Sequence, residues 1–139
     1  MPSIENLLLA NHAEAQNGLL YLVGAGWTDV HRPVLEGGMP PTHLGIGLSV
    51  LVGWTETNRI HRVLVYIEPE DGGEPLLRAE ADIEVGRPPG ALEGADQRAS
   101  MAISGEVVFP AAGGYSLVCE VGESETRRVS FRVHDQPLA

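Results

Sequence analysis

Short runs of alternating apolar and polar residues, separated by glycine and proline, constrain this chain more than any other feature of its sequence. The 139 residues include 17 glycines and 10 prolines, which fall mostly between the runs. Such spacing is typical of many strands joined by turns. Only Gly53 to Asn58 suggests a short helical turn. We predict eight strands, at residues 6–12, 19–27, 43–52, 60–68, 76–85, 98–109, 115–121 and 127–133.

Alternation within the runs assigns their faces, because successive side chains on a strand point to opposite sides. In the run 77–85, apolar residues alternate with charged ones, which predicts a half-buried strand. In the run 44–52, aliphatic residues alternate with Gly45, Gly47 and Ser49. Glycines on a strand usually mark a close approach by another backbone. The glycine-bearing face of residues 43–52 is therefore the second candidate for a binding surface, because small side chains permit another sheet to pack there.

Turn signals between the runs predict three hairpins and one crossing between sheets. The first hairpin uses Asn17-Gly18, which supplies the positive φ that a tight turn needs. The segment 86–97 is too long and proline-rich for a tight turn, which indicates a crossing from one sheet to another. The three hairpins would join 6–12 with 19–27, 60–68 with 76–85, and 115–121 with 127–133. This organisation predicts a single domain over residues 1–139, a two-sheet antiparallel sandwich of seven or eight strands.

The charge balance excludes several classes of partner and chemistry. Nineteen acidic residues against nine basic ones leave a net charge of −10, which disfavours binding to nucleic acid or to anionic membranes. All nine basic residues are arginines, so the chain cannot supply a Schiff-base lysine or a phosphate-loop lysine. A hydrophobic content of 43% is ordinary for a globular protein.

Cysteine content and hydropathy indicate a protein without disulfides, targeting signals or membrane spans. The single cysteine, Cys119, lies in an apolar strand pattern, where a buried inert thiol is expected. The N-terminal run lacks the basic start of a signal peptide, and no segment reaches membrane-spanning length. The expected location is the cytoplasm.

The stretch "YLVGAGWTD" at residues 21–29 invites comparison with a dinucleotide-binding loop. That fingerprint requires a third small residue and a following helix. Here Asp29 holds the third position, and Pro33, Pro40 and Pro41 exclude the helix. We therefore predict that Gly24 and Gly26 form a bulge or bend at a strand end.

The titratable residues give only weak candidates for a metal site. The acidic loop containing Glu68, Glu70, Asp71 and Glu74 is an alternative calcium site, although its spacing favours a solvated hairpin turn. Five histidines are scattered, and only folding would bring His12, His43 and His61 together. No nucleophile-elbow motif is present. We predict no catalytic residue and no cofactor.

Two tryptophans at strand ends are the best candidates for partner binding. Trp27 and Trp54 stand beside polar residues, where an aromatic ring either caps the core or contributes to a recognition surface. Arg59, His61 and Arg62 follow Trp54 closely. Core capping is the favoured interpretation, and this end of the domain is the first candidate for a binding surface.

The C-terminal stretch "FPAAGGYSLVCEVGESETRRVSFRV" resembles the last hairpin of bacterial immunoglobulin-like sandwich domains. This resemblance implies an immunoglobulin-like sandwich in which Tyr115 forms a tyrosine corner. The chain lacks the paired cysteines and the central tryptophan of antibody domains. Most of the chain also resembles a bacterial family of small uncharacterised β-rich proteins, on "LLLANHAEAQNGLLYLVGAGW", "NRIHRVLVYIEPEDG" and "VGRPPG". That resemblance implies no activity.

The expected role is a non-catalytic protein-interaction or structural module that binds a protein partner or itself. It rests on the missing catalytic features and on analogy, because a fold alone does not define a function. Three alternatives remain open: a small-ligand or calcium-binding domain, an enzyme of unrecognised type, and a component of a larger assembly.

Overall fold

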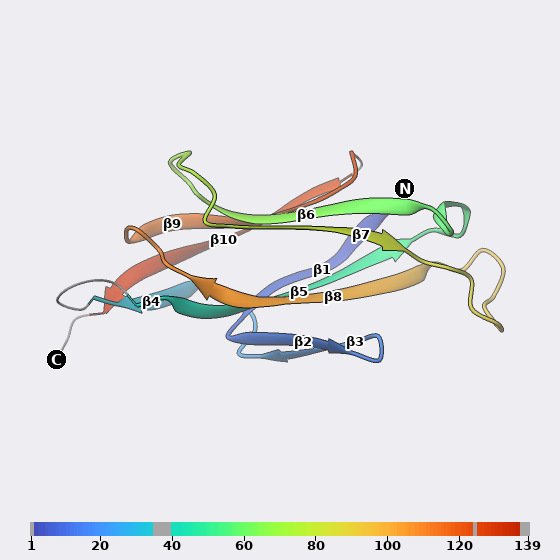
Figure 1. The fold of residues 1–139 in the computed structure, drawn as a ribbon, viewed down its shortest axis with the longest axis horizontal. Coiled ribbons are helices and arrows are strands. Elements are labelled where there is room, and N and C mark those ends of the chain that lie inside the picture. The colour runs from blue at the N-terminus through green and yellow to red at the C-terminus, as the bar shows by residue number, and fades with distance from the viewer. Residues whose placement is uncertain (1, 35–39, 124, 137–139) are drawn as a thin grey trace.

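The computed structural model describes residues 2–34, 40–123 and 125–136, and it is built of strands (Figure 1). The predicted helical turn is present as η1 (Trp54–Glu56), a single 3-10 turn. The strands are β1 (Ser3–Ala10), β2 (His12–Gln16), β3 (Leu19–Val23), β4 (Asp29–Pro33), β5 (Thr42–Val52), β6 (Ile60–Pro69), β7 (Leu77–Glu84), β8 (Gln97–Val107), β9 (Gly113–Val121) and β10 (Glu125–Gln136). The all-β prediction is confirmed, but the predicted number of strands was too low. The first predicted run is split at Asn11 into β1 and β2, and β4 was missed.

The strands form three sheets, so the prediction of two sheets was too simple. One sheet has the order β1-β5-β8, a second has the order β4-β10-β9-β6-β7, and the third is the hairpin β2-β3. Figure 1 shows them as layers, with the three-stranded sheet between the five-stranded sheet and the hairpin. The segment that follows β7 carries the chain from the five-stranded sheet to β8 of the three-stranded sheet, which confirms the predicted crossing.

The hydrophobic core lies between the three-stranded and five-stranded sheets. The predicted core face of β5 is fully buried, from Leu44 to Val52 on alternate residues. It meets the buried aliphatic residues of β6 and β9 and an aromatic cluster of Phe109, Tyr115 and Phe131. Burying one large apolar side chain contributes roughly 1.5–3 kcal/mol, so this core supplies most of the folding energy.

Two of the three predicted hairpins are confirmed, and the first is corrected. β6 pairs with β7, and β9 pairs with β10 through a turn whose Ser124 lies outside the described residues. Asn17 and Gly18 have φ angles of 52° and 75° and form the predicted turn. The strand that enters this turn is β2, however, because β1 pairs with β5 instead.

Local geometry bears on three further predictions. Gly24 and Gly26 have φ angles of 65° and 95°, so the Gly-x-Gly motif is a bend after β3. The Tyr115 hydroxyl donates a hydrogen bond of 2.6 Å to the carbonyl of Ala111, four residues upstream, as in a tyrosine corner. Cys119 is buried, and burial raises the pKa of its thiol to about 11, so the thiolate is scarce at neutral pH.

Across the part of the chain that the structure describes, no helix is long and apolar enough to cross a membrane.

Candidate functional site

The hairpin β2–β3 packs on the outer face of the three-stranded sheet, over the glycines of β5. A methyl group on Gly45 would lie 2.3 Å from the Ala13 nitrogen, and one on Gly47 would lie 2.8 Å from a Leu22 methyl carbon. The Ser104 hydroxyl of β8 accepts a hydrogen bond from the Ala13 amide at 3.3 Å and donates one to the Ala13 carbonyl at 2.7 Å. The glycine face predicted to receive a second sheet therefore receives the chain's own hairpin.

The outer face of the hairpin exposes a row of large apolar side chains. Leu19, Tyr21 and Val23 alternate along β3 and are 59%, 51% and 62% exposed. We call these three residues the apolar stripe. Leu20 and Leu22 point the other way and are half-buried against the sheet. Among the described residues, the other exposed large apolar side chains lie outside the hairpin: Leu8, Ile60, Leu92 and Val108.

Polar residues of β2 border the apolar stripe on the same face. Cross-strand pairing places His12 opposite Val23, Glu14 opposite Tyr21, and Gln16 opposite Leu19. The Glu14 carboxylate lies 3.1 Å from both the His12 ring nitrogen Nε2 and the Gln16 side-chain nitrogen. The hairpin face thus has an apolar row and a polar row, with one carboxylate at its centre.

Folding brings together only two of the three histidines considered as metal ligands. His12 Nδ1 lies 3.0 Å from His43 Nε2, and the two rings are stacked. His61 instead contacts the Glu56 carbonyl at 2.8 Å. Among the described residues there is no group of three or more His, Cys, Asp or Glu side chains that could hold a metal ion.

The predicted binding residues that follow β5 are engaged within the domain. The Arg87 guanidinium stacks over the Trp54 ring at 4.0 Å and donates a hydrogen bond to the Trp54 carbonyl. Arg59 pairs with Glu56 at 3.5 Å. Arg62 lies 3.4 Å from Asp82, its cross-strand partner on β7. These are local contacts with neighbouring loop and strand residues, and both core capping by Trp54 and binding at this end of the domain stay predictions.

Trp27 does not join the Trp54 group. Its indole nitrogen donates a hydrogen bond of 3.0 Å to the Asn11 side chain, and its ring meets Phe131 edge to face. Trp27 is half-buried and packs against the core between β3 and β4. The structure therefore divides the predicted binding residues between two places.

The acidic loop does not gather its carboxylates around one point. Glu68 forms an ion pair of 2.6 Å with Arg128, and Asp71 accepts a hydrogen bond from the Gly73 amide within the turn. Glu70 turns toward β9, where its carboxylate occupies the space that a Gly114 side chain would fill. Glu74 is exposed. This arrangement is that of a solvated hairpin turn.

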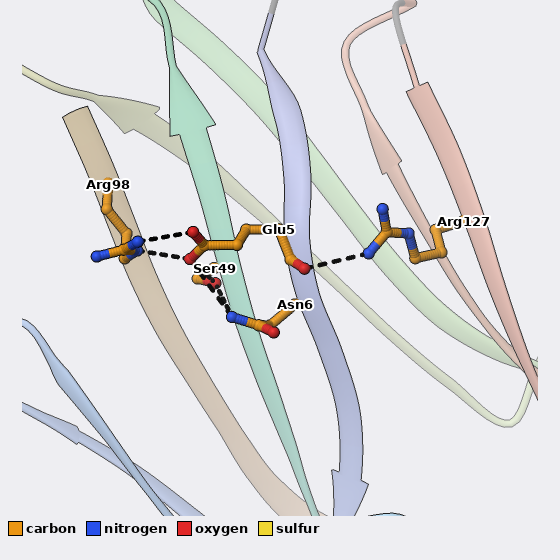
Figure 2. A network of polar contacts seen from close by, with 5 residues as sticks. All are labelled: Glu5, Asn6, Ser49, Arg98 and Arg127. Atoms are coloured by element: carbon orange, nitrogen blue, oxygen red, sulfur yellow. Dashed lines mark hydrogen bonds and ion pairs between the residues drawn. The ribbon is translucent and has the colours of Figure 1, made fainter. Parts of the chain in front are cut away.

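A polar network beside the hairpin tip ties β1 to both large sheets (Figure 2). Glu5, at a bulge in β1, accepts hydrogen bonds from Arg98 on β8 at 2.5 and 2.6 Å and from the Ser49 hydroxyl on β5 at 3.0 Å. Arg127 on β10 donates a hydrogen bond of 3.3 Å to the Glu5 carbonyl. Asn6 donates a hydrogen bond of 2.9 Å to Ser49. The network is complete within the chain, so we assign it to stability.

The Glu5 network makes stability depend on pH. The hydrogen bond from Arg98 holds the pKa of the Glu5 carboxyl below its ordinary value of 4.5. The contribution is therefore present above the unfolded-state pKa and is lost as pH falls through the folded-state pKa. We expect Glu5→Gln to lower the melting temperature at neutral pH, with the difference from wild type shrinking in acid. Melting curves across pH test this, with Glu93→Gln in the exposed loop before β8 as the control. An equal deficit at every pH would contradict it.

Comparison with known protein families assigns the chain to a family without assigning an activity. A family model described as "Family of unknown function (DUF6941)" matches residues 5–134. The chain belongs to this family, as the predicted resemblance to an uncharacterised family of small β-rich proteins implied. No curated protein sequence matches the chain significantly. The function must therefore be argued from the surface of the domain itself.

Proposed function

We propose that this protein is a non-catalytic interaction module and that the outer face of the hairpin β2–β3 is its binding surface. The observation that carries the proposal is the apolar stripe, in which three large side chains more than half exposed stand in a row. Contiguous exposed apolar surface with a polar border is typical of protein–protein interaction sites. Fully burying such a side chain contributes roughly 1.5–3 kcal/mol, so covering the stripe provides a substantial driving force.

The composition of the hairpin face matches that of a protein interface. The centres of interfaces are enriched in aromatic residues and depleted of charge, while their rims are polar. Tyr21 occupies the middle of the stripe, and His12, Glu14 and Gln16 lie along one side of it. Tyrosine is also among the residues that most often dominate binding energy. We therefore assign Tyr21 the largest contribution.

The proposal of a non-catalytic role is supported by the chemistry of one surface groove and of Cys119. A groove of 690 Å³ between β7 and β8 is open to solvent, and its carboxylates include Asp82, which pairs with Arg62. A catalytic site generally needs an enclosed pocket with convergent titratable groups. The buried thiol of Cys119 has its pKa raised, which is opposite to the change that activates a cysteine nucleophile.

An immunoglobulin-like sandwich with an added hairpin is the finer fold that we propose. In immunoglobulin domains the strands A, B and E are neighbours in one sheet, and C, F and G are neighbours in the other. The order β1-β5-β8 corresponds to the first set, and β6-β9-β10 corresponds to the second. The Tyr115 hydrogen bond at the start of β9 adds support. On this assignment β2–β3 is an insertion after the first strand, which suits a binding element. The cytoplasmic location stays a prediction.

Capture from a lysate of the source organism tests the proposed surface when stripe variants are compared with matched controls. We expect wild type to retain a protein partner that Leu19→Ser, Tyr21→Ser and Val23→Ser lose. Leu92→Ser and Val108→Ser change the same residue types at exposed positions elsewhere, and both should retain the partner. Melting curves confirm that every variant is folded. Equal recovery by stripe variants and controls, or no stripe-dependent partner, would overturn the proposal.

A further inference from the structure

The two edges of the hairpin differ in how far their outward backbone groups are satisfied: within the described residues, the edge of β2 is bonded to the three-stranded sheet at one residue, and the edge of β3 at none. In an antiparallel pair, alternate residues turn their N–H and C=O groups away from the partner strand. On β2 one such residue is Ala13, whose N–H and C=O are both bonded by Ser104. Because Ala13 pairs with Leu22, the N–H and C=O groups of Leu22 also point away from the partner strand. Those of Leu20, two residues earlier on β3, point the same way. Within the described residues, these outward groups of β3 have no hydrogen-bond partner.

β3 also lacks the charges that usually guard a free strand edge. Natural proteins place charged residues on edge strands, because an unguarded edge pairs with other chains. Every other strand at a sheet edge in the described structure carries a charged residue: Glu5 on β1, Glu14 on β2, Asp29 on β4, Glu80 on β7 and Arg98 on β8. β3 reads "LLYLV" and has none. Within the described residues, the outer edge of β3 therefore has no charged side chain and has backbone N–H and C=O groups without hydrogen-bond partners.

We propose that two copies of the chain pair through their β3 strands, antiparallel about Tyr21, to form a dimer with a continuous four-stranded sheet. This inference rests on the proposed function and names a partner for the same hairpin. Strand addition at an exposed edge is a common mode of recognition, in which backbone hydrogen bonds supply the affinity.

The register about Tyr21 follows from which residues face outward. Pairing Leu20 with Leu22 of the second copy, and Leu22 with its Leu20, joins every outward N–H to an outward C=O. The same register places Tyr21 opposite Tyr21, and Leu19 opposite Val23. Aromatic and β-branched cross-strand pairs stabilise antiparallel sheets. A pairing centred on Leu20 or on Leu22 would leave part of each strand without a partner.

A second copy fits this edge because the edge is uncharged. Each copy carries a net charge of −10, so two copies repel each other wherever acidic surfaces meet. Residues 15–28, which include all of β3, contain no charged residue. The sequence of β3 is also self-complementary, since each apolar residue meets another apolar residue. The contact is a short strand pair, so we expect a weak dimer that forms at micromolar to millimolar concentration.

Cysteine cross-linking of the purified protein tests both the dimer and its register. Tyr21 would face its own copy in a non-hydrogen-bonded pair, where Cα atoms lie about 4.5 Å apart, within the range that a disulfide accepts. Tyr21→Cys should therefore form a disulfide-linked dimer on air oxidation. Leu19→Cys or Val23→Cys alone should not, whereas a mixture of the two proteins should cross-link. The native Cys119 is buried and does not compete.

Sedimentation of wild type over rising concentration should show a shift from monomer to dimer, and Leu92→Cys is the control for random collision. The proposal is overturned if wild type stays monomeric at millimolar concentration. It is also overturned if Leu19→Cys, Tyr21→Cys and Leu92→Cys cross-link equally. Failure of the dimer is distinguishable from failure of the proposed function. If only the dimer fails, lysate capture still yields a stripe-dependent partner of a different sequence. If the proposed function fails, lysate capture yields no stripe-dependent partner.

Discussion

Gly45→Ala is expected to destabilise the protein by about 3 kcal/mol, the upper part of the range for overpacked sites. The added methyl would lie 2.3 Å from the Ala13 nitrogen and 2.6 Å from the His12 carbonyl carbon. Both atoms belong to backbone, which cannot rotate away as a side chain would. The hairpin must therefore lift off β5, and the Ser104 hydrogen bonds to Ala13 would be lost with it.

Chemical denaturation measures this effect, and Gly105→Ala is the matched control. Gly105 pairs with Leu44 on the same sheet, and its added methyl would meet only a Leu77 methyl carbon at an ordinary 3.8 Å. We expect the control to lie within about 0.5 kcal/mol of wild type, because its added methyl makes no close contact. Equal stabilities for the two variants would contradict the close contact between hairpin and sheet.

Phe131→Ala is expected to cost about 3–5 kcal/mol, the range for removal of a buried aromatic side chain. Phe131 is 2% exposed, and its ring packs against Phe109, Tyr115 and Trp27. Removal would leave a cavity at the junction of β9, β10 and the segment before β4. Ser130→Ala on the exposed face of β10 is the control and should change little. Thermal unfolding compares the two, and a small loss for Phe131→Ala would show that this cluster is not the core.

Much of the fold could be predicted from the sequence, because local rules specify it. The Asn17-Gly18 turn, the two later hairpins and the core face of β5 follow from turn chemistry and alternation. The division of β1 from β2 could not be read locally. It depends on Asn11. The backbone N–H of Asn11 donates a hydrogen bond to the Val23 carbonyl, and its side-chain oxygen accepts one from the Trp27 indole. β4 was missed because its parallel pairing with β10 is long-range and the run contains Pro33.

The candidate site was predicted only in part. The glycine face of β5 indicated that a sheet packs there, but it was predicted as a binding surface, and the pattern could not show that the chain's own hairpin covers it. The run "LLYLV" is apolar on both faces, and the sequence does not say which face is covered. In the structure, Leu22 packs half-buried against Gly47, and Tyr21 is exposed. The signal in the sequence for an interaction surface was an apolar run in a strand of a two-stranded hairpin.

Photo-cross-linking in living cells tests the central claim most directly. A benzoylphenylalanine at position 21 replaces one aromatic ring with another and reacts with whatever covers the stripe. We expect a cross-linked product from position 21 and little or none from position 92, which is exposed in a loop away from the hairpin. Products from position 92 or position 54 without any from position 21 would contradict the assignment of the hairpin face as the binding surface.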